Sequence, residues 1–203
     1  MTPDLIEGQR TVDSHGSSFA LDLLAALPRA PKVVLSPASA RTALGMALVG
    51  ARGQTAADLG AGLRIGSADP ADFHAGEAAR IARWNDPSRP YAVVSANAVF
   101  VAEGMRTVSG AAATLQEAYR APLRALAFAG DPAGATGEIN RWVKEITRGL
   151  VPEIATPGAI GPETRFVLTN ALYFKGEWRT KFLRDATHQA PFEVRPGEKP
   201  MVS

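Results

Sequence analysis

Cysteine is absent from this chain of 203 residues. Its absence excludes a disulfide framework, a thiolate zinc site and a cysteine nucleophile. Histidine is scarce: the chain has three, His15, His74 and His188, and none lies at helical ligand spacing from another. We therefore expect surface histidines rather than a catalytic or metal-binding set. We interpret Asp13-Ser14-His15 as solvated polar chain, and we predict no metal site.

Neither sign of charge dominates, because 22 basic residues face 20 acidic ones, for a formal net charge of +2. No apolar stretch reaches the roughly 18 residues that a membrane-spanning helix needs. This balance gives no indication of a nucleic-acid or membrane partner. Residues Met1 to Asp4 lack the basic and apolar segments of a secretory signal peptide. Abundant Ala, Arg, Gly and Pro with little Lys indicate a GC-rich, bacterial genome.

The motifs of common enzyme classes are also missing. The chain has no Gly-x-Ser-x-Gly elbow and no phosphate-binding Gly-x-x-x-x-Gly-Lys loop. Gly60-Ala61-Gly62 begins like a dinucleotide fingerprint, but Ile65 stands where the third glycine belongs, and the segment comes after a predicted helix rather than a strand. Without a nucleophile–base pair, an unrelated α/β enzyme is disfavoured. We predict no catalytic residues and no cofactor.

Helix-start signals organise the first part of the chain. Ser36 and Pro37 combine a capping serine with proline at the first helical position. The small residues after them indicate that another element packs very close to this helix. Thr55 with Asp58 resembles a capping box and predicts the start of a short second helix. Asp69-Pro70 predicts the start of a third.

Two long apolar runs predict the strands of one sheet. Tyr91 to Val101 and Arg165 to Phe174 are apolar almost throughout, which is typical of strands covered on both faces. Pro122 places a shorter predicted strand, Ala121 to Ala127, at a sheet edge. Asp131-Pro132 predicts the start of a strongly amphipathic helix that runs to Arg148. Helices together with these strands predict the α+β class.

Two asparagines interrupt the long apolar strands. Asn97 lies within the first strand and Asn170 within the second. A buried amide without a partner costs about 1–3 kcal/mol. The simpler interpretation is that each amide satisfies a local irregularity of its strand. The alternative is that both belong to a polar network at a place where the sheet must open.

Four blocks along the chain stand in a characteristic order and spacing. They are Val33-Val34-Leu35-Ser36-Pro37-Ala38-Ser39 with Leu48-Val49-Gly50-Ala51-Arg52-Gly53-Gln54-Thr55; Ser95-Ala96-Asn97-Ala98-Val99-Phe100-Val101; Ile139-Asn140-Arg141-Trp142-Val143 with Thr147-Arg148-Gly149-Leu150; and Val167-Leu168-Thr169-Asn170-Ala171-Leu172-Tyr173-Phe174-Lys175-Gly176-Glu177-Trp178. Together they resemble the serpin family. The resemblance covers Phe19 to Val202, nearly the whole chain.

The resemblance implies an α+β fold of three β-sheets surrounded by helices, with a large central sheet. It also implies that the helix from Asp131 to Arg148 lies across the face of that central sheet. Inhibitory members of the family present an exposed reactive loop as bait for a serine protease. The protease cleaves the loop and is held as an acyl-enzyme, while the loop inserts as a new strand into the central sheet. The family therefore implies a serine protease inhibitor that is not itself an enzyme, with a serine protease as its partner. A non-inhibitory binding or chaperone-like member is the alternative.

The resemblance also implies roles for individual residues. Ser36, Ser39 and Asn170 match the polar "shutter" that reorganises when the central sheet opens. Trp178 matches the tryptophan at the "breach", where the loop first enters, although core packing is an equal alternative. Arg165 to Phe174 matches the strand against which the loop inserts. For Trp142, on the crossing helix, simple packing is the favoured interpretation.

The C-terminal end departs from the family pattern. Lys199-Pro200-Met201-Val202-Ser203 resembles the start of a serpin strand, and the later segments of a serpin have no counterpart in this sequence. We therefore expect residues 1–203 to be the N-terminal portion of one serpin domain, without the hinge, the reactive-site bond or the C-terminal strands. Such a chain is expected to inhibit no protease alone. It is expected to self-associate through an open sheet edge or to need its C-terminal half. The family implies an extracellular location, with the cytoplasm as the alternative.

Overall fold

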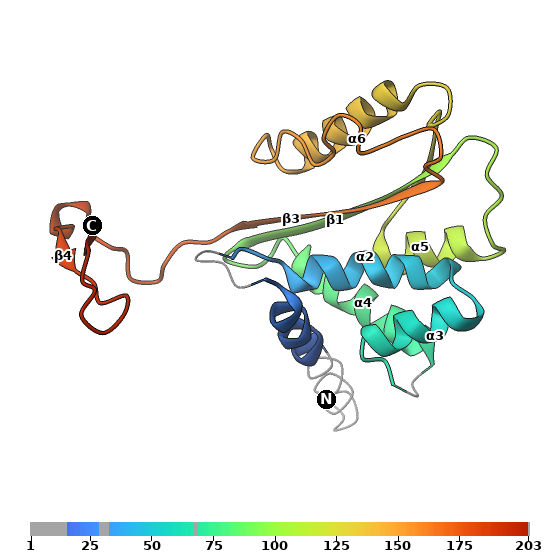
Figure 1. The fold of residues 1–203 in the computed structure, drawn as a ribbon. Helices are drawn as coiled ribbons and strands as arrows, with labels where there is room; N and C mark the ends of the chain where they lie inside the picture. The colour runs from blue at the N-terminus through green and yellow to red at the C-terminus, as the bar shows by residue number, and fades with distance from the viewer. Residues whose placement is uncertain (1–15, 29–32, 67–68, 203) are drawn as a thin grey trace.

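A computed structural model describes residues 16–28, 33–66 and 69–202 of the chain. A three-stranded sheet forms its middle layer (Figure 1). Helices α2, α3, α4 and α5 lie on one side of this sheet, and α6 lies on the other. The last segment leads away from this body to a small two-stranded sheet. The predicted α+β class is confirmed.

Strand β1, Ala92–Ala102, is the centre of the sheet. It pairs antiparallel with β3, Phe166–Lys175, in an unbroken register from Ala92 opposite Lys175 to Val101 opposite Phe166. On its other side it pairs in parallel with β2, Leu123–Leu126. The prediction that the two long strands are neighbours is confirmed. Among the described strands, β2 lies at the edge of the sheet, as predicted. Pro122, just before it, has no N–H to donate to a further neighbour.

Local capping determines where the helices on the first side begin. Residues 16–26 are helical. Helix α2, Pro37–Gly50, starts after Ser36, whose hydroxyl accepts a hydrogen bond from the Ser39 amide at 3.3 Å. Helix α4, Pro70–Trp84, starts after Asp69, which accepts from the Ala71 amide at 2.9 Å. Both starts agree with the sequence prediction, since side-chain caps and a first-turn proline act locally.

The predicted capping box at Thr55 and Asp58 is wrong. The N-cap of helix α3, Gly53–Gly62, is Arg52, three residues before Thr55, and no side chain of the described residues caps this helix. Asp58 instead accepts a hydrogen bond from the Gln54 side chain at 2.8 Å, one turn away on the helix surface. Gly53 adopts a positive φ of 57°, which lets the chain turn directly from α2 into α3. Helix α5, Ala111–Tyr119, comes after β1.

The two faces of β1 belong to two different cores. Val99 packs with residues of α2, α4 and α5, whereas its neighbours Ala98 and Phe100 pack under α6, Pro132–Ile146. Helix α6 begins after Asp131, whose carboxylate accepts from the Gly134 amide at 2.8 Å. The alternation results from strand geometry, because successive side chains point to opposite faces. The predicted double cover of this strand, and the crossing helix, are confirmed.

The prediction that Arg165–Phe174 is buried along its whole length is wrong. The strand forms, but Phe166 and Phe174 keep 53% and 67% of their surface exposed. The physical reason is the place of β3 in the sheet: among the described strands it pairs only with β1, so its other edge is open. The apolar composition does not distinguish a covered strand from an open-edged one, whereas the open edge agrees with the expectation drawn from the resemblance.

The C-terminal segment forms the short strands that the sequence predicts around Pro196-Gly197. A short 3-10 helix, η1, spans Arg184–Ala186. Strands β4, Ala190–Pro191, and β5, Met201–Val202, pair antiparallel. The turn between them places Gly197 at φ 85°, a left-handed conformation that suits glycine.

Candidate functional site

An asparagine pair lies in the middle of the sheet. Asn97 of β1 and Asn170 of β3 are directly opposite each other in the register. Asn170 Nδ2 donates to Asn97 Oδ1 at 2.7 Å and lies 3.3 Å from Ser95 Oγ. Asn97 Nδ2 donates in turn to the backbone carbonyl of Tyr119, at the end of α5, at 2.8 Å. The register runs through both residues without a bulge, so the interpretation as local irregularities is wrong and a polar network is present.

This network is incomplete on the side of β3. Asn170 Oδ1 is buried and has no hydrogen-bond partner among the residues that the structure describes. Buried acceptors are almost always satisfied, and leaving one unpaired costs about 1–3 kcal/mol. Among the described residues, Asn170 Oδ1 is therefore the one atom of this asparagine pair that is left to be paired.

Ser36 and Ser39 lie at the start of α2, which packs against β3. Their hydroxyl oxygens are 2.8 Å apart, and Ser36 also caps the helix. Within the part of the chain that the structure describes, no direct hydrogen bond joins either serine to Asn170. The structure thus places the three predicted shutter residues on two packed elements, in two separate hydrogen-bonded groups.

The two tryptophans of interest lie in opposite environments. Trp142 of α6 is 7% exposed and meets Phe100 of β1 edge-to-face, with ring centroids 6.1 Å apart. The packing interpretation of Trp142 is confirmed. Trp178, just beyond β3, is 73% exposed and meets Phe182 edge-to-face, with ring centroids 5.9 Å apart. Core packing of Trp178, one of its two alternatives, is therefore wrong in this chain.

A buried ion cluster between α2 and α4 was not predicted from the sequence. The Glu77 carboxylate is fully buried and pairs with Arg41 Nη1 at 3.1 Å and with Arg80 on its own helix. Thr42 Oγ1 accepts a hydrogen bond from Arg80 at 2.7 Å. Burial lowers the pKa of Arg41, and the nearby Glu77 charge opposes that effect. One feature of the sequence could have indicated this cluster: Glu77 lies one helical turn from both Phe73 and Ile81, on the apolar face of α4.

The surface prediction is wrong for one histidine. His74 of α4 is partly buried, and its Nδ1 lies 2.7 Å from the hydroxyl of Tyr119, which is fully buried. Burial lowers the pKa of His74 and raises that of Tyr119. His188 is exposed, as predicted, and His15 with the Asp13-Ser14-His15 segment lies outside the described residues.

Metal ligands and membrane-spanning helices are both missing from the described ranges. These ranges contain no cluster of three or more His, Asp or Glu side chains able to hold a metal ion. None of the helices within them is long and apolar enough to cross a membrane.

Comparison with known proteins covers nearly the whole chain. Residues 14–203 match the family model "Serpin (serine protease inhibitor)". The leukocyte elastase inhibitors of Bos taurus and Equus caballus are 36% and 35% identical over 94% and 93% of this chain. The chain spans about half the length of these curated relatives, 51% and 49%. Both are mammalian proteins, which lends no support to the bacterial source that the composition indicates.

A solved structure has the same fold. Emu ovalbumin (Dromaius novaehollandiae) superposes with a TM-score of 0.86 at 24% identity, over 94% of this chain and 53% of that one. The serpin-like fold expected from the four sequence blocks is thereby confirmed. The chain belongs to the serpin family, the serine protease inhibitors.

Proposed function

We propose that this chain supplies the receiving sheet of a serpin-type serine protease inhibitor, a suicide substrate whose cleaved loop inserts as a strand beside β3. The observation that carries the proposal is the open edge of β3 in the described sheet. A strand with unpaired backbone groups is a template for a further strand, and each new residue pair adds ladder hydrogen bonds. The partner is a serine protease, and the protein itself is not an enzyme.

The polar network supports the same proposal. A sheet that accepts a strand must rearrange around it, and Asn170 on β3 has a buried acceptor that no described residue pairs with. Ser36 and Ser39 lie on the helix packed against that strand. We propose that these three residues act as the shutter. We propose that the exposed Trp178, just beyond β3, marks the breach at which a loop enters.

The alternative is a serpin-fold protein that binds partners without inhibiting a protease. The two functions differ in the hinge of the reactive loop, where small residues permit insertion and bulky, charged or proline residues block it. The family favours an extracellular location for either function, with the cytoplasm as the alternative.

The test compares residues 1–203 with the longest product of the gene. Each is mixed in excess with elastase-like, trypsin-like and chymotrypsin-like serine proteases, and detergent-stable adducts are separated by electrophoresis. We expect a covalent complex only for a product that carries a hinge and reactive loop. If such a product is cleaved by every protease without forming an adduct, the inhibitory function is wrong and the binding function is favoured.

A further inference from the structure

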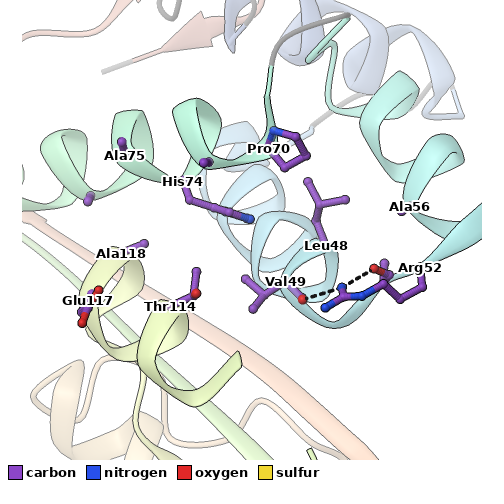
Figure 2. Close-up of a pocket in the computed structure, with 13 residues that line it drawn as sticks. Leu48, Val49, Arg52, Ala56, Pro70, His74, Ala75, Thr114, Glu117 and Ala118 are labelled. Atoms are coloured by element: carbon purple, nitrogen blue, oxygen red, sulfur yellow. Dashed lines mark hydrogen bonds between the residues drawn. The ribbon is translucent and has the colours of Figure 1, made fainter. Parts of the chain in front are cut away.

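A cavity of about 690 Å³ lies between the ends of α2 and α3 and the sides of α4 and α5 (Figure 2). Its wall is mostly apolar, and includes Leu48, Val49, Pro70, Ala75, Ala78 and Ala118. This volume is in the range of pockets that hold small organic ligands, and such pockets combine apolar walls with a few placed polar groups. None of the residues that line the cavity belongs to β3 or to the group of Ser36, Ser39 and Asn170, so the cavity is a different site from the one proposed for inhibition.

The one partly buried imidazole of the described chain, His74, lines this cavity. Tyr119 is fully buried, and among the described residues its hydroxyl makes no hydrogen bond other than the one to His74 Nδ1. If Nδ1 carried the proton, the buried phenolic O–H would have no acceptor among the described residues, which is unfavourable. The phenol therefore donates to Nδ1, and the neutral imidazole carries its proton on Nε2.

The Nε2–H of His74 is a donor without a partner. It makes no hydrogen bond with the residues that the structure describes. It is also not among the buried side-chain atoms that lack a partner. Figure 2 shows the ring extending from α4 toward Leu48 and Val49 of α2. The cavity thus presents one positioned hydrogen-bond donor within an apolar wall.

The rim carries one charge of each sign. Arg52 Nη1 donates to the carbonyls of Val49 at 3.1 Å and Ala51 at 2.6 Å, which fixes the guanidinium beside the cavity (Figure 2). Toward the described residues, Arg52 donates hydrogen bonds from Nη1 only, which leaves its other N–H groups available to a ligand. Glu117 of α5 also lines the cavity and disfavours an anion close to it. A ligand carboxylate is therefore placed toward Arg52.

We propose that this cavity binds a small molecule with an apolar chain and a terminal carboxylate, such as a medium-chain fatty acid. The chain lies against the apolar wall, and the carboxylate accepts hydrogen bonds from His74 Nε2–H and the Arg52 guanidinium. A cation of the same length offers no acceptor to the imidazole and is repelled by Arg52, so Glu117 is the one rim charge that attracts it. The site therefore distinguishes carboxylates from amines of equal apolar surface.

The first test is calorimetric titration of the purified protein with decanoate and with decyltrimethylammonium, both below their micelle-forming concentrations. We expect decanoate to bind with a stoichiometry of one. We expect the cation to bind at least about tenfold more weakly, because one charge-assisted hydrogen bond contributes about that factor to the affinity. Equal binding of the two probes would overturn the proposal, since it would leave only apolar contact.

Variants locate the site. Ala75→Phe places a ring in the cavity from an exposed position of α4 and should abolish decanoate binding. Ala79→Phe makes the same change on the same helix at an exposed position that does not line the cavity, and should bind as the parent does. If Ala75→Phe binds decanoate with the parent affinity while remaining folded by circular dichroism, the cavity is not the site.

A second pair of variants tests the donor. His74→Phe should weaken decanoate binding about tenfold, and His188→Phe, at an exposed histidine, should not change it. If His74→Phe fails to fold because the Tyr119 hydroxyl loses its acceptor, the double variant His74→Phe/Tyr119→Phe removes both polar partners and serves in its place. Unchanged decanoate affinity in either variant would overturn the role of His74.

Discussion

Glu77 is a fully buried carboxylate, and two guanidinium groups compensate its charge. Arg41 approaches it from α2 and Arg80 from the next turn of α4. The two cations also lie over aromatic rings: Arg41 is 4.8 Å from the centroid of Phe73, and Arg80 is 4.3 Å from that of Trp84. A buried pair of this kind adds little net stability, but removing one partner is costly because the other charge stays buried.

Glu77→Gln is therefore expected to destabilise the fold by about 3–5 kcal/mol. Urea unfolding of the parent and the variant measures the difference. Glu138→Gln is the matched control, since Glu138 forms an exposed pair with Arg141 at 3.3 Å and should cost at most about 0.5 kcal/mol. A loss at Glu77 no greater than the loss at Glu138 would contradict the buried-charge account.

The half-buried imidazole of His74 predicts a pH dependence. Burial lowers its pKa in the folded state below the ordinary 6.5, although Glu77 opposes this shift. The unfolded chain then binds more protons as the pH falls through 6.5, so stability is complete above that value and decreases below it. The decrease ends once the pH passes the lowered folded-state pKa.

The measurement is the unfolding midpoint of the parent and of His74→Gln between pH 5 and 8. We expect the variant to show a flatter profile than the parent below pH 6.5. His188→Gln serves as the control and should reproduce the parent profile, because His188 is exposed. If both variants have the parent's slope, burial of His74 does not contribute to the pH dependence.

At the scale of elements, α2 packs through a close contact at Gly45 with side chains of α4 and α5 rather than through a broad apolar stripe. A Cβ added at Gly45 would lie 2.6 Å from the Tyr119 hydroxyl and 2.9 Å from Phe73 Cε1. The expectation of an element packed very close to this helix is confirmed there. Through this contact α2, α4 and α5 meet at one point, directly beneath the strand that carries Asn97.

Gly45→Ala is expected to destabilise by about 1–3 kcal/mol through overpacking, even though alanine is favoured over glycine in a helix by about 1 kcal/mol. Gly60→Ala in α3 is the matched control, because a Cβ there meets nothing within 4 Å, and it should stabilise by about 0.5–1 kcal/mol. Thermal unfolding of both variants shows whether each substitution raises or lowers the stability of the fold. A stabilised Gly45→Ala would show that the contact with Tyr119 and Phe73 relaxes freely.

At the scale of the whole molecule, the described sheet ends in an open edge. Strand β3 has a partner on one side only, and between Arg165 and Lys175 it carries no charge and no proline to discourage pairing with another chain. Large apolar side chains remain exposed along this strand and in the segment after it, including Phe166, Phe174, Trp178 and Phe182. Surfaces of this kind favour association.

We therefore expect residues 1–203, purified alone, to be marginally stable and to self-associate unless a C-terminal half is supplied in trans. Sedimentation at low micromolar concentration should show species larger than the monomer. Phe174→Lys adds a charge to an exposed position of the open-edged strand and should shift the distribution toward the monomer. A monodisperse monomer with a cooperative unfolding transition would contradict this interpretation of the open edge.

The sequence by itself determined the features whose causes are local or repeated along the chain. Ser36, Asp69 and Asp131 predict their helices because a cap and a first-turn proline act within one turn. The two long apolar runs form paired strands, and the four blocks indicate the family from their residues alone. The false capping box at Thr55 shows where local patterns fail, since a short polar pattern also fits a helix surface.

Only the tertiary structure decided which distant residues meet. Arg41 and Glu77 are 36 positions apart and His74 and Tyr119 are 45 apart, so no spacing in the sequence pairs them. The Asn97–Asn170 contact depends on the strand register, which a shift of one residue would destroy. The exposure of β3 depends on which strand lies beside it. Each of these is a property of packing between elements, and the composition of a single element does not contain it.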